Sequence, residues 1–126
     1  MKRVIVFLLI SMLGAVSALA ADQAMTGEDL TKLLAKGKVL TLGGPGKGYS
    51  GSLTLGSNGV GKGSAKTDAG KTIDLAGPWE IVGDQFCRVW SGSGSSGKQV
   101  CETWIKTGKR SVDVVVDGKV IGFNSW

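Results

Sequence analysis

The sequence contains no recognisable catalytic motif. The chain has no histidine and only two cysteines, Cys87 and Cys101. The lack of histidine excludes Ser-His-Asp and Cys-His nucleophiles and the common zinc ligand sets. In an oxidising compartment an even pair of cysteines is most simply a disulfide. A Ser-Lys dyad stays open on composition alone, but no motif supports one, so we predict no catalytic residue, no metal site and no cofactor.

Two glycine-rich stretches are similar to a phosphate-binding loop. Residues 56–63 and 92–99 both match the pattern G-x-x-x-x-G-K, but Gly63 and Gln99 stand where Ser or Thr should hold magnesium. A working phosphate loop also needs a helix behind it, because the helix N-terminus supplies the positive field. Neither stretch precedes a predicted helix, so we expect no nucleotide binding.

Four acidic residues lie in candidate strands: Glu80, Glu102, Asp74 and Asp113. A glycosidase needs two carboxylates at a set separation across a cleft, and a very small barrel rarely provides one. We therefore expect these groups to be solvated or ion-paired. An enzyme in which Glu80 and Glu102 converge with a lysine is kept as the weakest alternative.

Tryptophans are the most promising binding residues in the sequence. We expect Trp79 to lie in the core, whereas Trp90 and Trp104 suit either the core or an outward face that stacks on sugar rings or bases. Together with neighbouring charges they define a candidate binding surface, made of Arg88, Trp90, Trp104 and Glu102.

One short helix is expected near the start of the elements that position these side chains. Thr26 and Asp29 have the spacing of a capping box. Three leucines follow on one helical face, and Gly37 suits a left-handed C-terminal cap. The pattern predicts an amphipathic helix over residues 27–36.

Beyond this helix the chain consists of short β-type segments separated by Gly, Asn and Asp. We expect residues 58–59, Asn-Gly, to form a two-residue hairpin turn, and residues 77–78, Gly-Pro, to interrupt a strand. The pattern predicts a mainly β fold, a small antiparallel meander that curls into a barrel or sandwich. The expected strands are residues 38–42, 49–56, 60–67, 71–75, 79–82, 85–90, 99–106, 110–116 and 119–123.

The cysteines allow the register of the central hairpin to be predicted. If Cys87 faces Cys101 across an antiparallel pair, Phe86 faces Glu102. Side chains alternate along a strand, so Phe86 and Arg88 share the face opposite the cysteines. Arg88 and Glu102 then become diagonal neighbours, close enough for their long side chains to meet.

The last hairpin can be treated in the same way. Residues 117–118, Asp-Gly, favour a two-residue turn. Such a turn sets Val114 opposite Ile121 and Val112 opposite Phe123. We expect these four side chains to form a layer of the core.

The first twenty residues have the three parts of a secretory signal. Lys2 and Arg3 are followed by an apolar run over residues 4–16, and then by Ala18 and Ala20 in an A-x-A arrangement. We expect residues 1–20 to be a signal peptide that is cleaved after Ala20. The apolar run is shorter than the roughly 20 residues that span a bilayer, so we expect export and not a membrane anchor.

Residues 21–126 are then expected to form a single small β domain in the periplasm or outside the cell. Loss of Lys2 and Arg3 leaves 13 bases against 10 acids and lowers the formal net charge from +5 to +3. The basic residues are spread along the chain, so we expect no nucleic-acid partner. We also expect the mature chain not to span a membrane.

Residues 77–90, GPWEIVGDQFCRVW, together with Cys101, resemble a group of small secreted Gram-negative proteins of unknown function. Their shared pattern is Gly-x-Trp, a turn, Cys-x-x-Trp, a loop and a second Cys. The resemblance implies a periplasmic all-β domain and brings no activity with it. Gly77-x-Trp79 is also similar to the lipocalin (calycin) signature, but lipocalins carry it on the first strand, so ligand carriage is not implied.

We expect a non-catalytic binding or interaction module with a protein or small-ligand partner. The long loops at residues 43–48 and 91–97 are the expected recognition segments, because binding residues concentrate on loops held by a rigid scaffold. The alternative is an inhibitor of an extracytoplasmic hydrolase such as a lysozyme.

Overall fold

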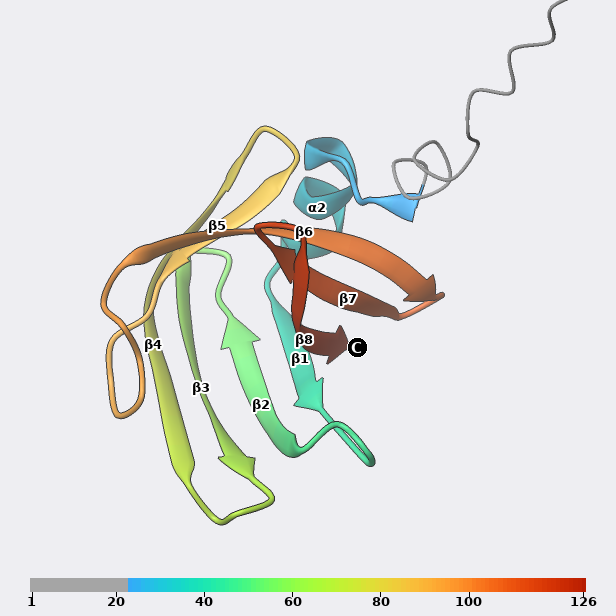
Figure 1. Cartoon of the computed structure of the whole chain (residues 1–126). Helices are drawn as coiled ribbons and strands as arrows, with labels where there is room; N and C mark the ends of the chain where they lie inside the picture. Colours follow the sequence, from blue (N-terminus) through green and yellow to red (C-terminus); the bar gives the residue numbers. More distant parts are fainter. Residues whose placement is uncertain (1–22) are drawn as a thin grey trace, which may run out of the picture.

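The chain folds into a closed β-barrel preceded by a short helix (Figure 1), and the computed structural model describes residues 23–126. Each strand pairs antiparallel with the next along the chain, and the first strand pairs with the last. This confirms the predicted mainly β meander with one short N-terminal helix. The predicted signal peptide, residues 1–20, lies outside the described residues. The elements are α2 (Gly27–Leu34), β1 (Lys38–Gly43), β2 (Tyr49–Leu55), β3 (Val60–Thr67), β4 (Thr72–Val82), β5 (Gln85–Val89), β6 (Gln99–Gly108), β7 (Ser111–Val116) and β8 (Lys119–Ser125).

Helix α2 begins at the predicted capping box. The Asp29 backbone N–H donates to Thr26 Oγ1 at 3.1 Å, and the Thr26 N–H donates to Asp29 Oδ2 at 3.1 Å. Hydrogen bonding of the Asp29 carboxylate to the Thr26 backbone N–H, and to the Thr26 side chain, lowers the pKa of Asp29, because it favours the charged form. The helix ends at Leu34, two residues earlier than predicted, and Gly37 has the expected positive φ of 80°.

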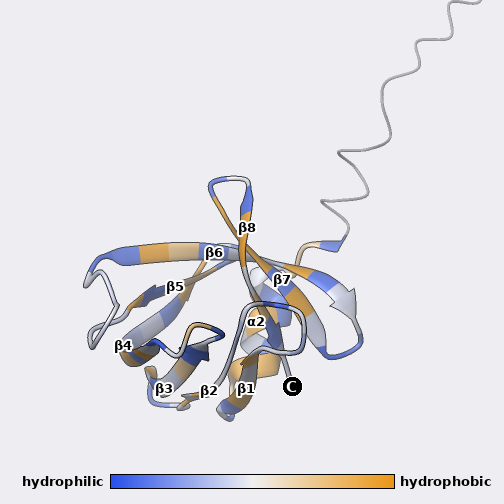
Figure 2. Ribbon diagram, turned by 60° about the horizontal axis from the view of Figure 1, so that its bottom comes forward, coloured by the Kyte–Doolittle hydropathy of each residue, from blue (hydrophilic) through white to orange (hydrophobic). Residues whose placement is uncertain are grey.

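Helix α2 closes one end of the barrel. The Gly27 N–H donates to Asp84 Oδ1 at 2.7 Å, which ties the helix to the turn between β4 and β5. Leu30 and Leu34 are fully buried in the barrel core. In Figure 2 the strands form a ring and α2 lies within its outline. The amphipathic helix therefore acts as an apolar plug.

Aromatic side chains fill the part of the barrel next to this plug. The ring centroids of Phe86 and Trp104 lie 5.1 Å apart, Trp79 stacks on Phe86 at 5.6 Å, and Trp126 stacks on Trp104 at 6.5 Å. Trp104 and Phe86 are almost completely inaccessible to solvent. Trp79 packs against this core as expected, and its buried indole Nε1 has no hydrogen-bond partner among residues 23–126.

The predicted interruption at residues 77–78 is wrong, because β4 runs through both residues without a break. Gly77 has a φ of 151°, and a Cβ there would overlap the Val89 carbonyl oxygen. Glycine thus lets β4 bend and pass closely beside β5. The first half of β4 pairs with β3 and the second half with β5.

The turn between β2 and β3 is one residue longer than predicted. Leu55 pairs with Gly61, and Gly59 takes the left-handed conformation with a φ of 80°. The Asn58 side chain accepts from the Val60 N–H at 3.2 Å. This is the three-residue hairpin loop in which the last loop residue is left-handed. At the other strand ends the predicted bounds differ by at most two residues.

The register predicted for the last hairpin is also wrong beyond the turn. Residues 117–118 form the expected two-residue turn, but the register shifts between Val114 and Val115. Val114 then pairs with Gly122 and not with Ile121, which is 51% exposed. Phe123 pairs with Asp113, whereas the expected core residues Val112 and Val114 are indeed buried.

Candidate functional site

The end of the barrel opposite α2 is hollow. A cavity of about 380 Å³ enters the barrel from the end that carries the β1–β2, β3–β4, β5–β6 and β7–β8 connections. Its rim includes the exposed residues Gly94, Ser96 and Ile121, so the cavity opens to solvent. An eight-stranded barrel has room for one small ligand when side chains do not fill it. The wall is mostly apolar, and its apolar and aromatic residues include Leu42, Leu53, Ala65, Ile73, Leu75 and Trp90.

Small residues on β3 explain why this part of the barrel stays open. Inward-facing positions alternate along the strand, and here they hold Gly61, Gly63 and Ala65. The space inside Gly61 is taken by the Trp90 indole, since a Cβ there would lie 2.7 Å from the ring. Beyond Trp90, β3 contributes the small side chain of Ala65 to the cavity wall, and the volume remains empty.

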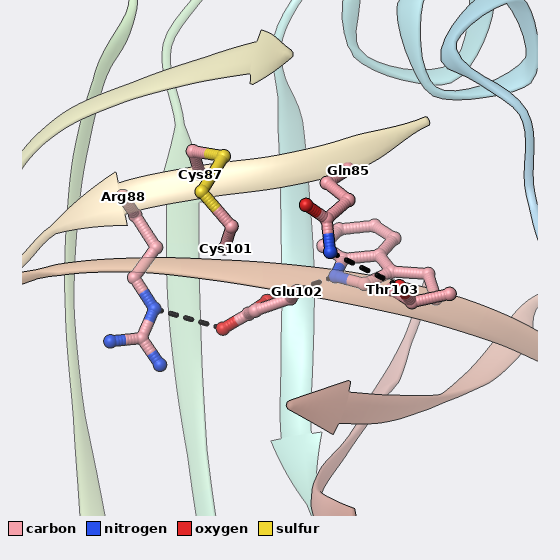
Figure 3. The surroundings of a disulfide bond; sticks show 7 residues. Gln85, Cys87, Arg88, Cys101, Glu102 and Thr103 are labelled. Atoms are coloured by element: carbon pink, nitrogen blue, oxygen red, sulfur yellow. Dashed lines mark hydrogen bonds and ion pairs between the residues drawn. A yellow bond between two sulfur atoms is a disulfide. The ribbon is translucent and has the colours of Figure 1, made fainter. Parts of the chain in front are cut away.

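A buried ion pair lies in the inner part of the cavity (Figure 3). Arg88 Nε on β5 donates to Glu102 Oε2 on β6 at 2.8 Å. Trp104 Nε1 donates to the other carboxylate oxygen of Glu102 at 2.9 Å. Arg88 and Glu102 were expected to be diagonal neighbours, and this expectation is confirmed. Each oxygen of the buried carboxylate therefore has one hydrogen-bond donor.

Burial raises the pKa of Glu102 above its ordinary value of 4.5. The Arg88 charge and the hydrogen bonds from Trp104 and Arg88 act in the opposite direction but do not cancel the loss of hydration. Only 6% of the surface of Glu102 is exposed to solvent. Glu102 therefore holds a proton more readily in the folded chain than in the unfolded chain.

We expect the stability of the wild type relative to Glu102→Gln to fall as the pH rises above 4.5. In this range the folded state binds more protons than the unfolded state, so deprotonation favours unfolding until the pH passes the folded pKa. Glutamine does not titrate and keeps an acceptor for Trp104. Urea unfolding of both proteins across this pH range measures the difference.

Asp29→Asn is the matched control with the opposite sign. The pKa of Asp29 is lowered, so its contribution is present above 3.8 and is lost as the pH falls below that value. A difference between wild type and Glu102→Gln that does not change with pH would contradict the raised pKa of Glu102.

The disulfide lies on the opposite face of the same hairpin. Cys87 and Cys101 are bonded, and their Cα atoms lie 4.0 Å apart across β5 and β6. This confirms the predicted pairing. On the same outer face Gln85 Nε2 donates to Thr103 Oγ1 at 3.4 Å (Figure 3). The covalent link thus holds together the two strands that carry Arg88 and Glu102.

The Ser/Gly-rich loop between β5 and β6, residues 91–97, forms part of the cavity wall. The Ser91 N–H donates to the Ala76 carbonyl at 2.8 Å, and the Asp74 N–H donates to the Ser93 carbonyl at 3.0 Å. Ser95 Oγ adds a bond to the Asp74 carbonyl at 2.8 Å. The loop therefore continues the sheet beside β4, where β5 no longer pairs with it.

The four residues of the candidate binding surface all face the barrel interior. Arg88 and Glu102 form the ion pair, Trp90 is 6% exposed, and Trp104 is buried. All four line the cavity and none forms an outer stacking face. The structure thus brings the sequence-derived residues together, but on the inner wall.

The sequence analysis did not identify two further polar residues of the cavity wall. Tyr49 Oη accepts from the Phe123 N–H at 2.9 Å, and Asn124 is a buried polar side chain on β8. Tyr49 could have been predicted from the sequence, because its position on β2 places it on the same face as the buried Leu53 and Leu55. Asn124 could not, since the bulge reverses which residues of β8 face inward.

The other candidate groups do not converge. Glu80 is exposed on the outer face of β4, whereas Glu102 points into the barrel, so the two carboxylates do not form a pair. Residues 56–63 lead into β3 and residues 92–99 lead into β6. Neither glycine-rich stretch therefore has the helix that a phosphate loop needs.

Comparisons of the chain with protein-family models, with curated proteins and with solved structures find no match. Within residues 23–126, no helix has the length and apolar character needed to cross a membrane. In the same part of the chain, no group of three or more His, Cys, Asp or Glu side chains could hold a metal ion.

Proposed function

We propose that this chain is a non-catalytic binding protein of the periplasm or the extracellular space, and that its ligand is a small molecule held inside the barrel. The observation that carries the proposal is the solvent-open cavity of about 380 Å³. Its volume lies near the lower end of the range of ligand pockets, about 300–1,000 Å³. A mostly apolar wall with a few polar groups is typical of such pockets.

The buried ion pair supports a ligand site over a packing defect. The ion pair of Arg88 and Glu102 is held by backbone pairing and by the disulfide behind it. A buried ion pair rarely stabilises a fold more than a well-packed apolar pair of similar volume would. Its presence inside the barrel therefore favours a functional role. The disulfide itself is consistent with an exported protein, in which thiols are oxidised.

Binding is tested with three amphiphiles of equal chain length, namely decanol, decanoate and decylamine, below the concentrations at which they aggregate. Trp90 and Trp104 line the cavity, so we expect binding to change the intrinsic tryptophan fluorescence. Ala65→Phe places a ring in the cavity and is expected to lower the affinity at least about tenfold. Calorimetry checks the same affinities without a fluorophore.

Lys66→Phe is the matched control, because the neighbouring side chain on β3 is exposed on the outer face. It should bind as the wild type does. The proposal fails if no member of the series binds, or if Ala65→Phe and Lys66→Phe bind equally well while both remain folded.

A further inference from the structure

Arg88 uses only part of its hydrogen-bonding capacity. A guanidinium group carries five N–H donors, of which Nε–H is one. In residues 23–126 the Arg88 bond that we find is the one from Nε to Glu102. Figure 3 shows the two terminal nitrogens on the side of the guanidinium group away from Glu102. Because Arg88 lines the cavity, its two terminal nitrogens are therefore available to bind a ligand there.

The terminal nitrogens of Arg88 favour an anionic ligand. The terminal nitrogens of arginine match two oxygens of one carboxylate, and such bidentate pairs are short and strong. A ligand cation has a poorer partner, because Glu102 is 6% exposed and its charge is already paired with Arg88. Arg88 itself is largely buried, with 16% of its side chain exposed, so its charge is weakly screened.

The remaining wall suits an alkyl group. Leu53, Ile73 and Leu75 also line the cavity, and Ile121 lies at its rim; all four side chains are apolar. The titratable residues that line the cavity are Arg88, Glu102 and Tyr49, so within the described chain Arg88 supplies the positive charge of the wall.

We propose that the ligand is a small amphiphile with an anionic head group, a carboxylate or a similar oxyanion, which the terminal nitrogens of Arg88 bind while its apolar tail extends toward the open end of the barrel. This inference rests on the proposed function and names the ligand class of the same site. Glu102 orients the guanidinium group from the other side through Nε, and the disulfide-linked hairpin fixes both residues.

A bound anion also affects Glu102. Two negative groups then share one arginine, which favours the protonated form of the carboxyl group. Of the other titratable groups in the wall, Arg88 and Tyr49, the Arg88 charge opposes this change. We therefore expect binding to be accompanied by uptake of a proton, so that decanesulfonate, which stays ionised, binds more tightly as the pH falls.

The test is the ratio of the affinities for decanoate and decanol at neutral pH. In the wild type we expect a ratio of at least about ten, with decylamine weaker than either. In Arg88→Gln/Glu102→Gln, which removes both charges together, the ratio should fall to about one. Glu102→Gln alone keeps the acceptor for Trp104 and removes the competing charge, so its ratio should rise.

Lys98→Gln is the charge control, because it removes one positive charge from an exposed position beside the loop at residues 91–97. Its ratio should equal that of the wild type. Equal binding of decanol and decanoate would overturn the anionic head group and leave the proposed function in place. Failure of all three amphiphiles would overturn both, and a preference retained by the double variant would exclude Arg88 as the receptor.

Discussion

Arg88→Met is expected to lower the free energy of unfolding by about 3–5 kcal/mol, because it leaves the Glu102 carboxylate buried without its counter-ion. The two groups are in contact at 2.8 Å, and Glu102 is almost completely removed from water. Methionine fills a similar volume, so the loss should come from the unpaired charge and not from packing. Urea unfolding at neutral pH measures it.

A double-mutant cycle separates the charge from other effects. In Arg88→Met/Glu102→Gln no charge remains, and the Trp104 N–H still has an acceptor. We expect this variant to regain most of the lost stability, since an ion pair replaced as a whole costs little. If the double variant loses the sum of the two single losses, the ion pair is not coupled and its description as a buried pair is wrong.

Removal of the disulfide is expected to have the next largest effect. Cys87 and Cys101 are separated by 14 positions, and closing a loop of about 15 residues stabilises a fold by about 3 kcal/mol through the entropy of the unfolded chain. Small domains have net stabilities of about 5–15 kcal/mol, so Cys87→Ala/Cys101→Ala should unfold at much lower urea concentration.

Chemical reduction provides the control for this prediction. A thiol reductant should shift the urea midpoint of the wild type toward that of the double-alanine variant and leave the variant unchanged. Equal midpoints for the oxidised wild type, the reduced wild type and the variant would show that the bond does not stabilise the barrel. Because β5 and β6 carry Arg88 and Glu102, we also expect weaker ligand binding after reduction.

The central hairpin was predictable from the sequence, because two cysteines fix a register. Once Cys87 faces Cys101, alternation places Phe86 and Arg88 on the inner face with Glu102. The capping box of α2 was equally local, since it depends on side chains three residues apart. These features needed no knowledge of the rest of the fold.

The cavity and part of its wall were not predictable in this way. The bulge at Val114 and Val115 turns Asn124 inward, and no residue of the Asp-Gly turn signals it. The volume inside the barrel depends on how side chains from eight strands share the space, including the fit of Trp90 against Gly61. The spacing of residues along one strand does not determine the volume that remains inside the barrel.

The most direct measurement is the NMR spectrum of arginine and tryptophan side-chain N–H groups during titration with decanoate. We predict that the Arg88 Nε–H and the Trp104 indole N–H shift most, because both bind Glu102 at the inner end of the cavity. Shifts confined to outer-face groups such as the Gln85 amide, with Arg88 and Trp104 unchanged, would contradict binding inside the barrel.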